Sequence, residues 1–335
     1  MPLVPVRSLM LDITDAASRG VIIGERGHIL VSESRSDWRQ VEGVPTRSTL
    51  TAVAAVGDKV WAVGHEGTIL HSADGGLTWS VQREEHKPSD AELDDPDFEF
   101  DPRRGAPLLD VMFVDGDRGF AIGAFSLMLH TSDGGAHWER VSVTGANKEE
   151  TDEPAAQGGD EWTFDESDLA LEEESDPHLN GIARDEKGLL VAVGERGAAF
   201  RSRDDGKTWE RLQLPYGGSM FGVLALGPGH FLAYGLRGHV LETRDAGSSW
   251  VELDTSTELS LMGGAVVPDS QGGVVLVGAN GVVLYRPDAN TPLGRSTFVN
   301  QNQETPVLAA VWPIGARTFL VVGERGIGRH EVPAN

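Results

Sequence analysis

A short apolar run that ends in glycine recurs along the chain. One copy is Val21-Ile22-Ile23-Gly24, and another is Val191-Ala192-Val193-Gly194. The seven terminal glycines are Gly24, Gly64, Gly123, Gly194, Gly235, Gly278 and Gly323. Most copies lie 40 to 45 residues apart, and two intervals are longer, at 59 and 71 residues. Self-similarity with this period is typical of β-propellers, in which each repeat forms one blade.

In six copies a second glycine follows the first three positions later. These glycines are Gly27, Gly67, Gly197, Gly238, Gly281 and Gly326, and Ser126 stands at the equivalent position of the third copy. The pattern predicts a strand, a tight turn and a second strand. We expect the glycines at both edges of the turn to supply the positive φ values that short hairpins need.

A second signature follows in four copies, where an aspartate, one or two glycines and a tryptophan form a turn. The pairs are Asp74 and Trp79, Asp133 and Trp138, Asp204 and Trp209, and Asp245 and Trp250. The first copy is degenerate, from Ser32 to Trp38, and the last two copies lack the signature. An aspartate in such a turn can accept hydrogen bonds from nearby backbone N–H groups. We therefore interpret these residues as structural, with each tryptophan buried between blades.

Each repeat has room for four strands. In the second repeat the first three are expected at 50–56, 60–63 and 68–72, and the fourth begins at Trp79. The sequence therefore predicts an all-β, seven-bladed β-propeller that spans 1–335 as a single domain. The seventh repeat ends after its third strand, near Glu331. We expect Pro2–Val6 to supply the missing fourth strand and to close the ring, so that loss of this segment would lower stability.

The amino-acid composition argues against several classes of function. The chain has 52 acidic and 28 basic residues and a formal net charge of −24, which argues against nucleic-acid binding through a broad basic surface. It has no cysteine, so thiol catalysis and disulfides are excluded. No apolar run reaches the length of a membrane-spanning helix, and no signal peptide is visible at the start.

Most of the acidity belongs to two insertions, at about 83–107 and 144–177, which account for the two long intervals between repeats. They carry net charges of −5 and −12. Phe98 and Phe100 alternate with acids in the first, and Trp162 and Phe164 lie among acids in the second. The first insertion is predicted to be a solvated acidic loop that its two phenylalanines hold against the protein. The second is a disordered tether or a segment that folds against a partner. Both follow a fourth strand, so we expect them on the face that carries the turns between second and third strands.

Those turns have a charge pattern of their own. The residue before the second glycine is arginine in four of seven repeats, namely Arg26, Arg196, Arg237 and Arg325. Duplication of one repeat with an exposed polar residue at its turn would explain this pattern without any function. Alternatively, the arginines dock the acidic insertions, or they bind an anionic partner when the insertions move.

The four aspartate turns and the seven glycine-ended strands resemble the Asp-box, or BNR, repeat proteins. The arrangement is most similar to the photosystem II stability/assembly factor family, which also has relatives in non-photosynthetic bacteria, some of them encoded beside RND-type transporters. The resemblance implies a non-catalytic scaffold that binds membrane-protein assembly intermediates from the lumenal or periplasmic side. We expect a monomer rather than an oligomer. An exported location is then expected, with a cytoplasmic one as the alternative.

Sialidases and other glycosidases also carry Asp boxes, so a hydrolase is the alternative function. A sialidase needs an arginine cluster and a tyrosine nucleophile beside a glutamate. Of the three tyrosines, Tyr216 lies in a loop expected near the arginine turns, whereas Tyr234 ends a core strand and Tyr285 is expected to follow a third strand. The histidines show no zinc-binding spacing, and no glycine-rich phosphate loop is present, so we expect no metal and no cofactor.

Overall fold

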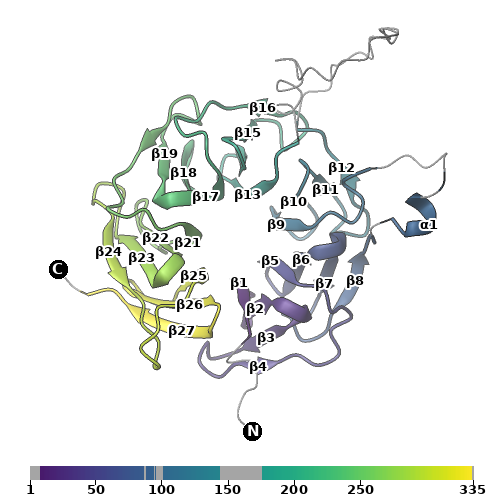
Figure 1. The fold of residues 1–335 in the computed structure, drawn as a ribbon, viewed down its shortest axis with the longest axis horizontal. Coiled ribbons are helices and arrows are strands. Elements are labelled where there is room, and N and C mark those ends of the chain that lie inside the picture. Colours follow the sequence, from purple (N-terminus) through teal and green to yellow (C-terminus); the bar gives the residue numbers. More distant parts are fainter. Residues whose placement is uncertain (1–7, 87, 94, 96–100, 144–175, 334–335) are drawn as a thin grey trace, which may run out of the picture.

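The computed structural model describes residues 8–86, 88–93, 95, 101–143 and 176–333. It contains seven small antiparallel sheets arranged in a ring (Figure 1). The first strands of the sheets line a cavity at the centre of the ring, which we call the central channel. The predicted seven-bladed β-propeller is therefore confirmed. Within each sheet the strands follow one another in chain order, and we call them a, b, c and d from the channel outwards.

The strands of the first four blades have these bounds. The first sheet contains β1 (Met10–Asp15), β2 (Gly20–Gly24), β3 (Ile29–Ser32) and β4 (Arg39–Gln40). The second contains β5 (Leu50–Val56), β6 (Lys59–Gly64), β7 (Ile69–Ser72) and β8 (Ser80–Arg83). The third contains β9 (Leu108–Phe113), β10 (Gly119–Gly123), β11 (Met128–Thr131) and β12 (Glu139–Arg140). The fourth contains β13 (Leu179–Arg184), β14 (Leu190–Gly194), β15 (Ala199–Ser202) and β16 (Glu210–Arg211).

Three further sheets complete the ring. The fifth contains β17 (Met220–Gly227), β18 (His230–Gly235), β19 (Val240–Thr243) and β20 (Val251–Glu252). The sixth contains β21 (Leu261–Val266), β22 (Val274–Gly278), β23 (Val282–Arg286) and β24 (Gly294–Thr297). The seventh contains β25 (Leu308–Pro313), β26 (Thr318–Gly323) and β27 (Gly326–Glu331). A four-residue helix, α1 (Asp90–Leu93), lies in the first insertion.

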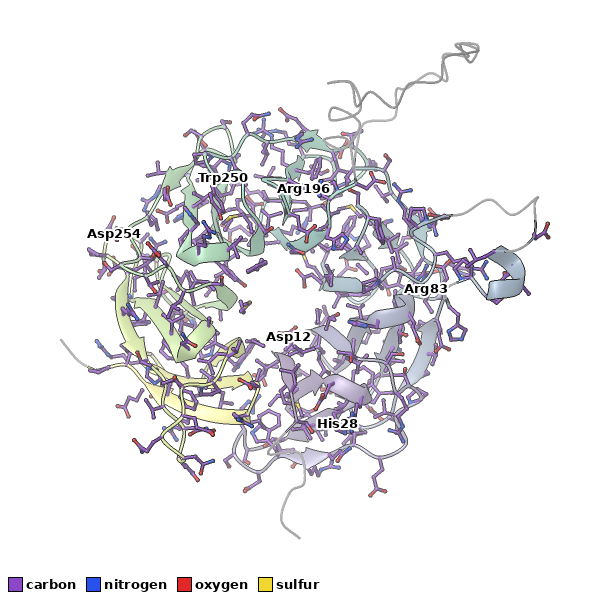
Figure 2. All side chains as sticks on the ribbon, viewed as in Figure 1. Asp12, His28, Arg83, Arg196, Trp250 and Asp254 are labelled. Atoms are coloured by element: carbon purple, nitrogen blue, oxygen red, sulfur yellow. The ribbon has the colours of Figure 1, made fainter. Side chains whose placement is uncertain are left out.

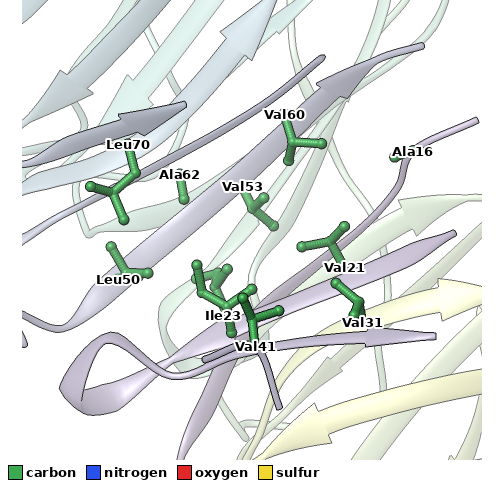
Figure 3. Close-up of a cluster of buried hydrophobic side chains, with 11 residues drawn as sticks. Ala16, Val21, Ile23, Val31, Val41, Leu50, Val53, Val60, Ala62 and Leu70 are labelled. Carbon is green, nitrogen blue, oxygen red and sulfur yellow. The ribbon is translucent and has the colours of Figure 1, made fainter. Parts of the chain in front are cut away.

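The hydrophobic core lies between neighbouring blades. Strand b of each blade is buried on both faces, which is why its sequence is a continuous apolar run and not an alternating one. Figure 3 shows one cluster, in which Val21, Ile23 and Val31 of the first blade meet Val53 and Leu70 of the second. Repetition of such clusters around the ring holds each blade to the next.

Hydrogen bonds to the aspartate side chain stabilise each aspartate turn from within. In the second blade Asp74 Oδ1 accepts hydrogen bonds from the N–H groups of Leu77 and Thr78, at 3.0 and 2.9 Å. The Thr78 hydroxyl donates to Asp74 Oδ2 at 2.6 Å. Asp133, Asp204 and Asp245 each accept the equivalent bond from the backbone four residues later. The tryptophans pack into the clusters between blades, as Trp250 does between the fourth and fifth.

The first glycine of each turn has a different role from the one we expected. Gly24 has φ of −175°, which is an extended conformation open to any residue, so the expected positive φ is wrong at this position. The requirement is for space, because a Cβ on Gly24 would lie 2.2 Å from the backbone oxygen of Leu9. That oxygen is held in place by the N–H of Glu25 at 3.0 Å. Only the second glycine, such as Gly27 with φ of 68°, uses the left-handed region.

The last blade has three strands among the described residues, in the order β25-β26-β27. The segment expected to supply its fourth strand, 2–6, lies outside the described residues. The described part of the chain therefore leaves the outer edge of β27 without a neighbouring strand.

Candidate partner-binding face

One end of the ring carries the turns between strands b and c together with the connections from strand d to the next strand a. Glu85, just after β8, donates its N–H to the carbonyl of Glu66 in a b–c turn, at 2.9 Å. Ser126 of another b–c turn donates its N–H to Pro177 at the end of the second insertion, also at 2.9 Å. We call this end the b–c face. The aspartate turns lie at the opposite end with the a–b turns, where Gly75 donates to Asp58 at 2.8 Å.

The arginines at three of the turn tips have a strained backbone. Arg26, Arg196 and Arg237 have φ of 55°, 52° and 55°, in the left-handed region. A residue with a side chain costs roughly 1–2 kcal/mol there, whereas glycine does not. All three side chains are exposed. Glycine at these three positions would avoid this cost, so the arginines do not stabilise the turn backbone.

The fourth arginine lies in a different turn. Arg325 belongs to a two-residue link between the paired residues Gly323 and Gly326, and its φ is not positive. Its Nε is 3.4 Å from Glu304 Oε2, so it is an ion-paired side chain. The remaining tips are Glu66, Phe125 and Asn280, also with positive φ.

The described ends of both insertions meet beside the third blade. Arg103 donates from Nε to the carbonyl of Phe125 at 3.1 Å, and its Nη2 bonds Asp176. Arg140 binds Asp101 of the first insertion. Asp101, Arg103, Arg140 and Asp176 together form what we call the anchoring network. It fixes the end of the first insertion, and the residues that flank the second, on the b–c face.

Arg83 extends this arrangement to the second blade. Its Nη1 donates to the carbonyl of Gly67 at 2.7 Å, and its Nη2 bonds Glu85. In Figure 2 it lies on the side of the ring that bears α1. The sequence pattern predicted a docking role for the tip arginines and gave no sign of Arg83, Arg103 and Arg140. The aromatic candidates Phe98, Phe100, Trp162 and Phe164 lie outside the described residues.

A broad hollow beside Arg237 lies on the same face, between the fifth and sixth blades. It has a volume of about 1140 Å³, and Arg237, His239, Glu252 and Arg295 contribute to its walls. His239 Nδ1 is 2.5 Å from Glu252 Oε1. Tyr216 stacks on the His239 ring with centroids 3.7 Å apart, and packs against the core cluster of the fourth and fifth blades.

The other two tyrosines are packing residues. Tyr234 is 6% exposed, and it fills the space above Gly222 and Gly264, where a Cβ would come within 2.8 Å of its ring atoms. Tyr285 is also 6% exposed and donates its hydroxyl to the carbonyl of Ala316 at 3.0 Å. Tyr234 also lines the cavity at the centre of the ring.

Each innermost strand carries a β-bulge near its start, seen as a shift of register in all seven sheets. The bulge re-aims the residues that follow it. In the first and third blades Asp12 and Asp110 come next, and both line a cavity of about 480 Å³ in the central channel. Figure 2 shows Asp12 at the inner edge of the ring.

Each of these carboxylates joins two blades. Asp12 Oδ1 accepts the N–H of Ile13, and Oδ2 accepts the N–H of Val53 in the next blade, both at 2.8 Å. Asp110 accepts from Ile182 of the next blade in the same way, at 2.8 Å. Burial raises the pKa of both carboxyl groups to about 7, although these N–H bonds favour the charged form.

One exposed group among the described residues has the composition of a weak metal site. Ligand atoms of Glu66, Glu84 and His86 lie within 4.8 Å of one another. All three side chains are exposed, so water competes with them for any cation. In the described part of the chain no helix is long and apolar enough to cross a membrane.

No protein-family model matches the chain, and no curated protein sequence does. Solved structures do. A structure described as YCF48 bound to D1 peptide aligns over 99% of this chain and 96% of its own, with a TM-score of 0.65 and 16% identity. YCF48 from Cyanidioschyzon merolae aligns over 99% and 97%, with a TM-score of 0.65 and 14% identity.

These likenesses establish the fold. A third solved structure, the GH74 enzyme of Niastella koreensis, matches 96% of this chain at 12% identity and a TM-score of 0.66. The match covers 52% of that enzyme's chain, so this protein spans about half its length. A peptide-bound propeller and an enzyme propeller therefore share the architecture, and the function has to be argued from the site.

Proposed function

We propose that this protein is a non-catalytic propeller that binds a protein partner through its b–c face. Similarity to a YCF48 propeller solved with a D1 peptide supports a polypeptide ligand. The partner we propose is a membrane-protein complex, such as a photosystem-like or RND-type assembly, met from its soluble side. We also propose an exported, periplasmic location for that encounter.

The strained tip arginines carry this proposal. Arg35, at the opposite end of the ring, also has a positive φ, of 58°, but it is held by a 2.5 Å ion pair with Asp15. Arg26 and Arg237 have no such ion pair with any described residue. Backbone strain that local contacts do not compensate is typical of binding sites. Their exposed guanidinium groups suit carboxylates or carbonyl groups of a partner.

Replacing both residues in the double variant Arg26→Gly/Arg237→Gly tests the proposal. Glycine relieves the left-handed strain, so stability should stay the same or rise by up to about 1 kcal/mol per site. Recovery of the partner from detergent-solubilised membranes should nevertheless fall at least tenfold. Thermal unfolding and quantitative co-purification on tagged protein measure the two effects.

The matched control is Arg35→Gly, which removes a left-handed arginine from the opposite end of the ring. It should leave partner recovery unchanged, although loss of the Asp15 ion pair affects stability. Full recovery with the double variant, or an equal loss with the control, would contradict a role for the b–c face.

A glycoside hydrolase remains the second candidate, favoured by the likeness to the GH74 propeller and by the two channel carboxyl groups. Asp12 and Asp110 would then be the acid and the base. Turnover of aryl glycosides that is lost in Asp110→Asn would support this alternative.

A further inference from the structure

The cavity in the central channel is lined by residues from all seven blades. Figure 1 shows the innermost strands of the seven sheets around the middle of the ring. The volume of this cavity, about 480 Å³, lies within the range of small-molecule sites in proteins. Such sites combine a mostly apolar wall with a few placed polar groups. The chemistry of the wall therefore indicates which ligand the cavity can hold.

Much of the wall is apolar and not covered by other side chains. Four of the seven bulge residues of strand a are large and apolar, and all four line the cavity: Leu11, Leu109, Phe221 and Met262. Met262 is 39% exposed, and Val266 on the same strand is 36% exposed. Among the described residues, Phe221 belongs to none of the clusters that hold the blades together. These side chains offer apolar surface to a ligand inside the channel.

The polar part of the wall includes the carboxyl groups of Asp12 and Asp110. Asp110 Oδ1 accepts the N–H of Val111, and Oδ2 accepts the N–H of Ile182, both at 2.8 Å. Backbone N–H groups of the first and second blades hold Asp12 in the same way. These bonds use two of the roughly four acceptor positions of each carboxylate. Each group is therefore fixed in orientation and keeps acceptor positions for the donors of a ligand.

The charge of the wall selects the sign of the ligand. Among the described residues that line the cavity there is no lysine, arginine or histidine. Tyr234 is the one further titratable residue of that group, and burial raises its pKa well above the usual range, so it stays neutral. Burial, and to a smaller extent the charge of Asp110, disfavour the charged form of Asp12. A cation held between the two carboxylates would offset both effects, because a nearby opposite charge favours the ionised form.

We propose that the central channel binds a small organic cation, namely a primary amine with a compact apolar body. The ammonium group donates hydrogen bonds to Asp12 and Asp110, and the apolar body lies against the rings of Phe221 and Trp312, which both line the cavity. A hard metal ion such as Ca²⁺ fits this wall less well, because it needs about six to eight oxygen ligands and gains nothing from apolar side chains. This proposal concerns the inside of the ring and is independent of partner binding through the b–c face.

Isothermal titration calorimetry of the full-length protein at pH 8 compares benzylamine with benzyl alcohol, which has a similar shape and no charge. We expect saturable one-to-one binding of benzylamine and at least tenfold weaker binding of the alcohol. Asp110→Asn and Phe221→Ala should each weaken the binding of benzylamine at least tenfold, and thermal unfolding shows that both variants are folded. Asp37→Asn, at an exposed position outside the channel, is the matched control and should bind as the original protein does.

The pH dependence of binding provides a second readout. At pH 6 the carboxyl groups of Asp12 and Asp110, with pKa values of about 7, are mostly protonated, whereas benzylamine keeps its charge. The affinity should therefore fall at least fivefold between pH 8 and pH 6, and binding at pH 6 should release protons to the buffer. Absence of benzylamine binding, equal binding of the alcohol, or unchanged affinity in Asp110→Asn would overturn the proposal. Binding of Ca²⁺ in preference to the amine would overturn it too.

Discussion

Replacing Gly278 with alanine is expected to lower the free energy of unfolding by more than about 3 kcal/mol. A Cβ at this position would lie 2.0 Å from the backbone oxygen of Ser260. That oxygen cannot move away freely, because it accepts the N–H of Ala279 at 2.9 Å. The expected loss combines a broken backbone contact with displacement of strand β21, at the large end of the range for point mutations. Denaturant unfolding followed by tryptophan fluorescence measures it.

Gly217→Ala is the control for this substitution. No atom lies within 4 Å of a Cβ at Gly217, and its φ is not in the left-handed region. Alanine there should be tolerated, with a change below about 0.5 kcal/mol. Equal stability of Gly278→Ala and Gly217→Ala would show that the glycine-ended strands are not held by this close approach.

Stability is expected to fall as the pH rises from 5.5 to 8. The folded-state pKa of Asp12 and Asp110 is about 7, which is above the unfolded value of about 3.9. The folded chain therefore holds protons that the unfolded chain releases, and this difference is lost above the folded pKa. At about 1.4 kcal/mol for each pKa unit, the two groups together should account for a fall of a few kcal/mol.

Asp12→Asn isolates one of these contributions, because asparagine has the shape of the protonated carboxyl group but cannot ionise. Its unfolding free energy, measured in denaturant across the same pH range, should change less steeply than that of the original protein. Asp37→Asn, at an exposed position, should keep the original dependence. A slope that is the same in Asp12→Asn and in the original protein would rule out a half-buried Asp12 carboxyl group that charges near neutral pH.

Local patterns predicted the fold because its stabilising contacts are themselves local and repeated. The Asp204 turn is an example, since its partners Ser202 and Thr208 lie within four residues. The Thr208 hydroxyl and N–H bonds hold the pKa of Asp204 at about 2, as expected for a carboxylate that accepts several hydrogen bonds. Such a turn can be read directly from the sequence.

The parts that the sequence did not reveal depend on residues far apart along the chain. Arg103 meets Asp176 across 73 positions, and no spacing rule connects them. The close approach at Gly24 is equally hidden, because it is set by the carbonyl of Leu9, which directly precedes the neighbouring strand β1.

Site-specific photo-crosslinking in living cells tests the binding role of the b–c face most directly. A photoreactive amino acid is placed at Arg26 or Arg237 on this face, and at Asp58 or Arg203 at the opposite end of the ring. We predict that the first two positions trap the same discrete membrane-associated protein and that the last two do not. Crosslinks from the opposite end alone, or none from the b–c face, would contradict the account.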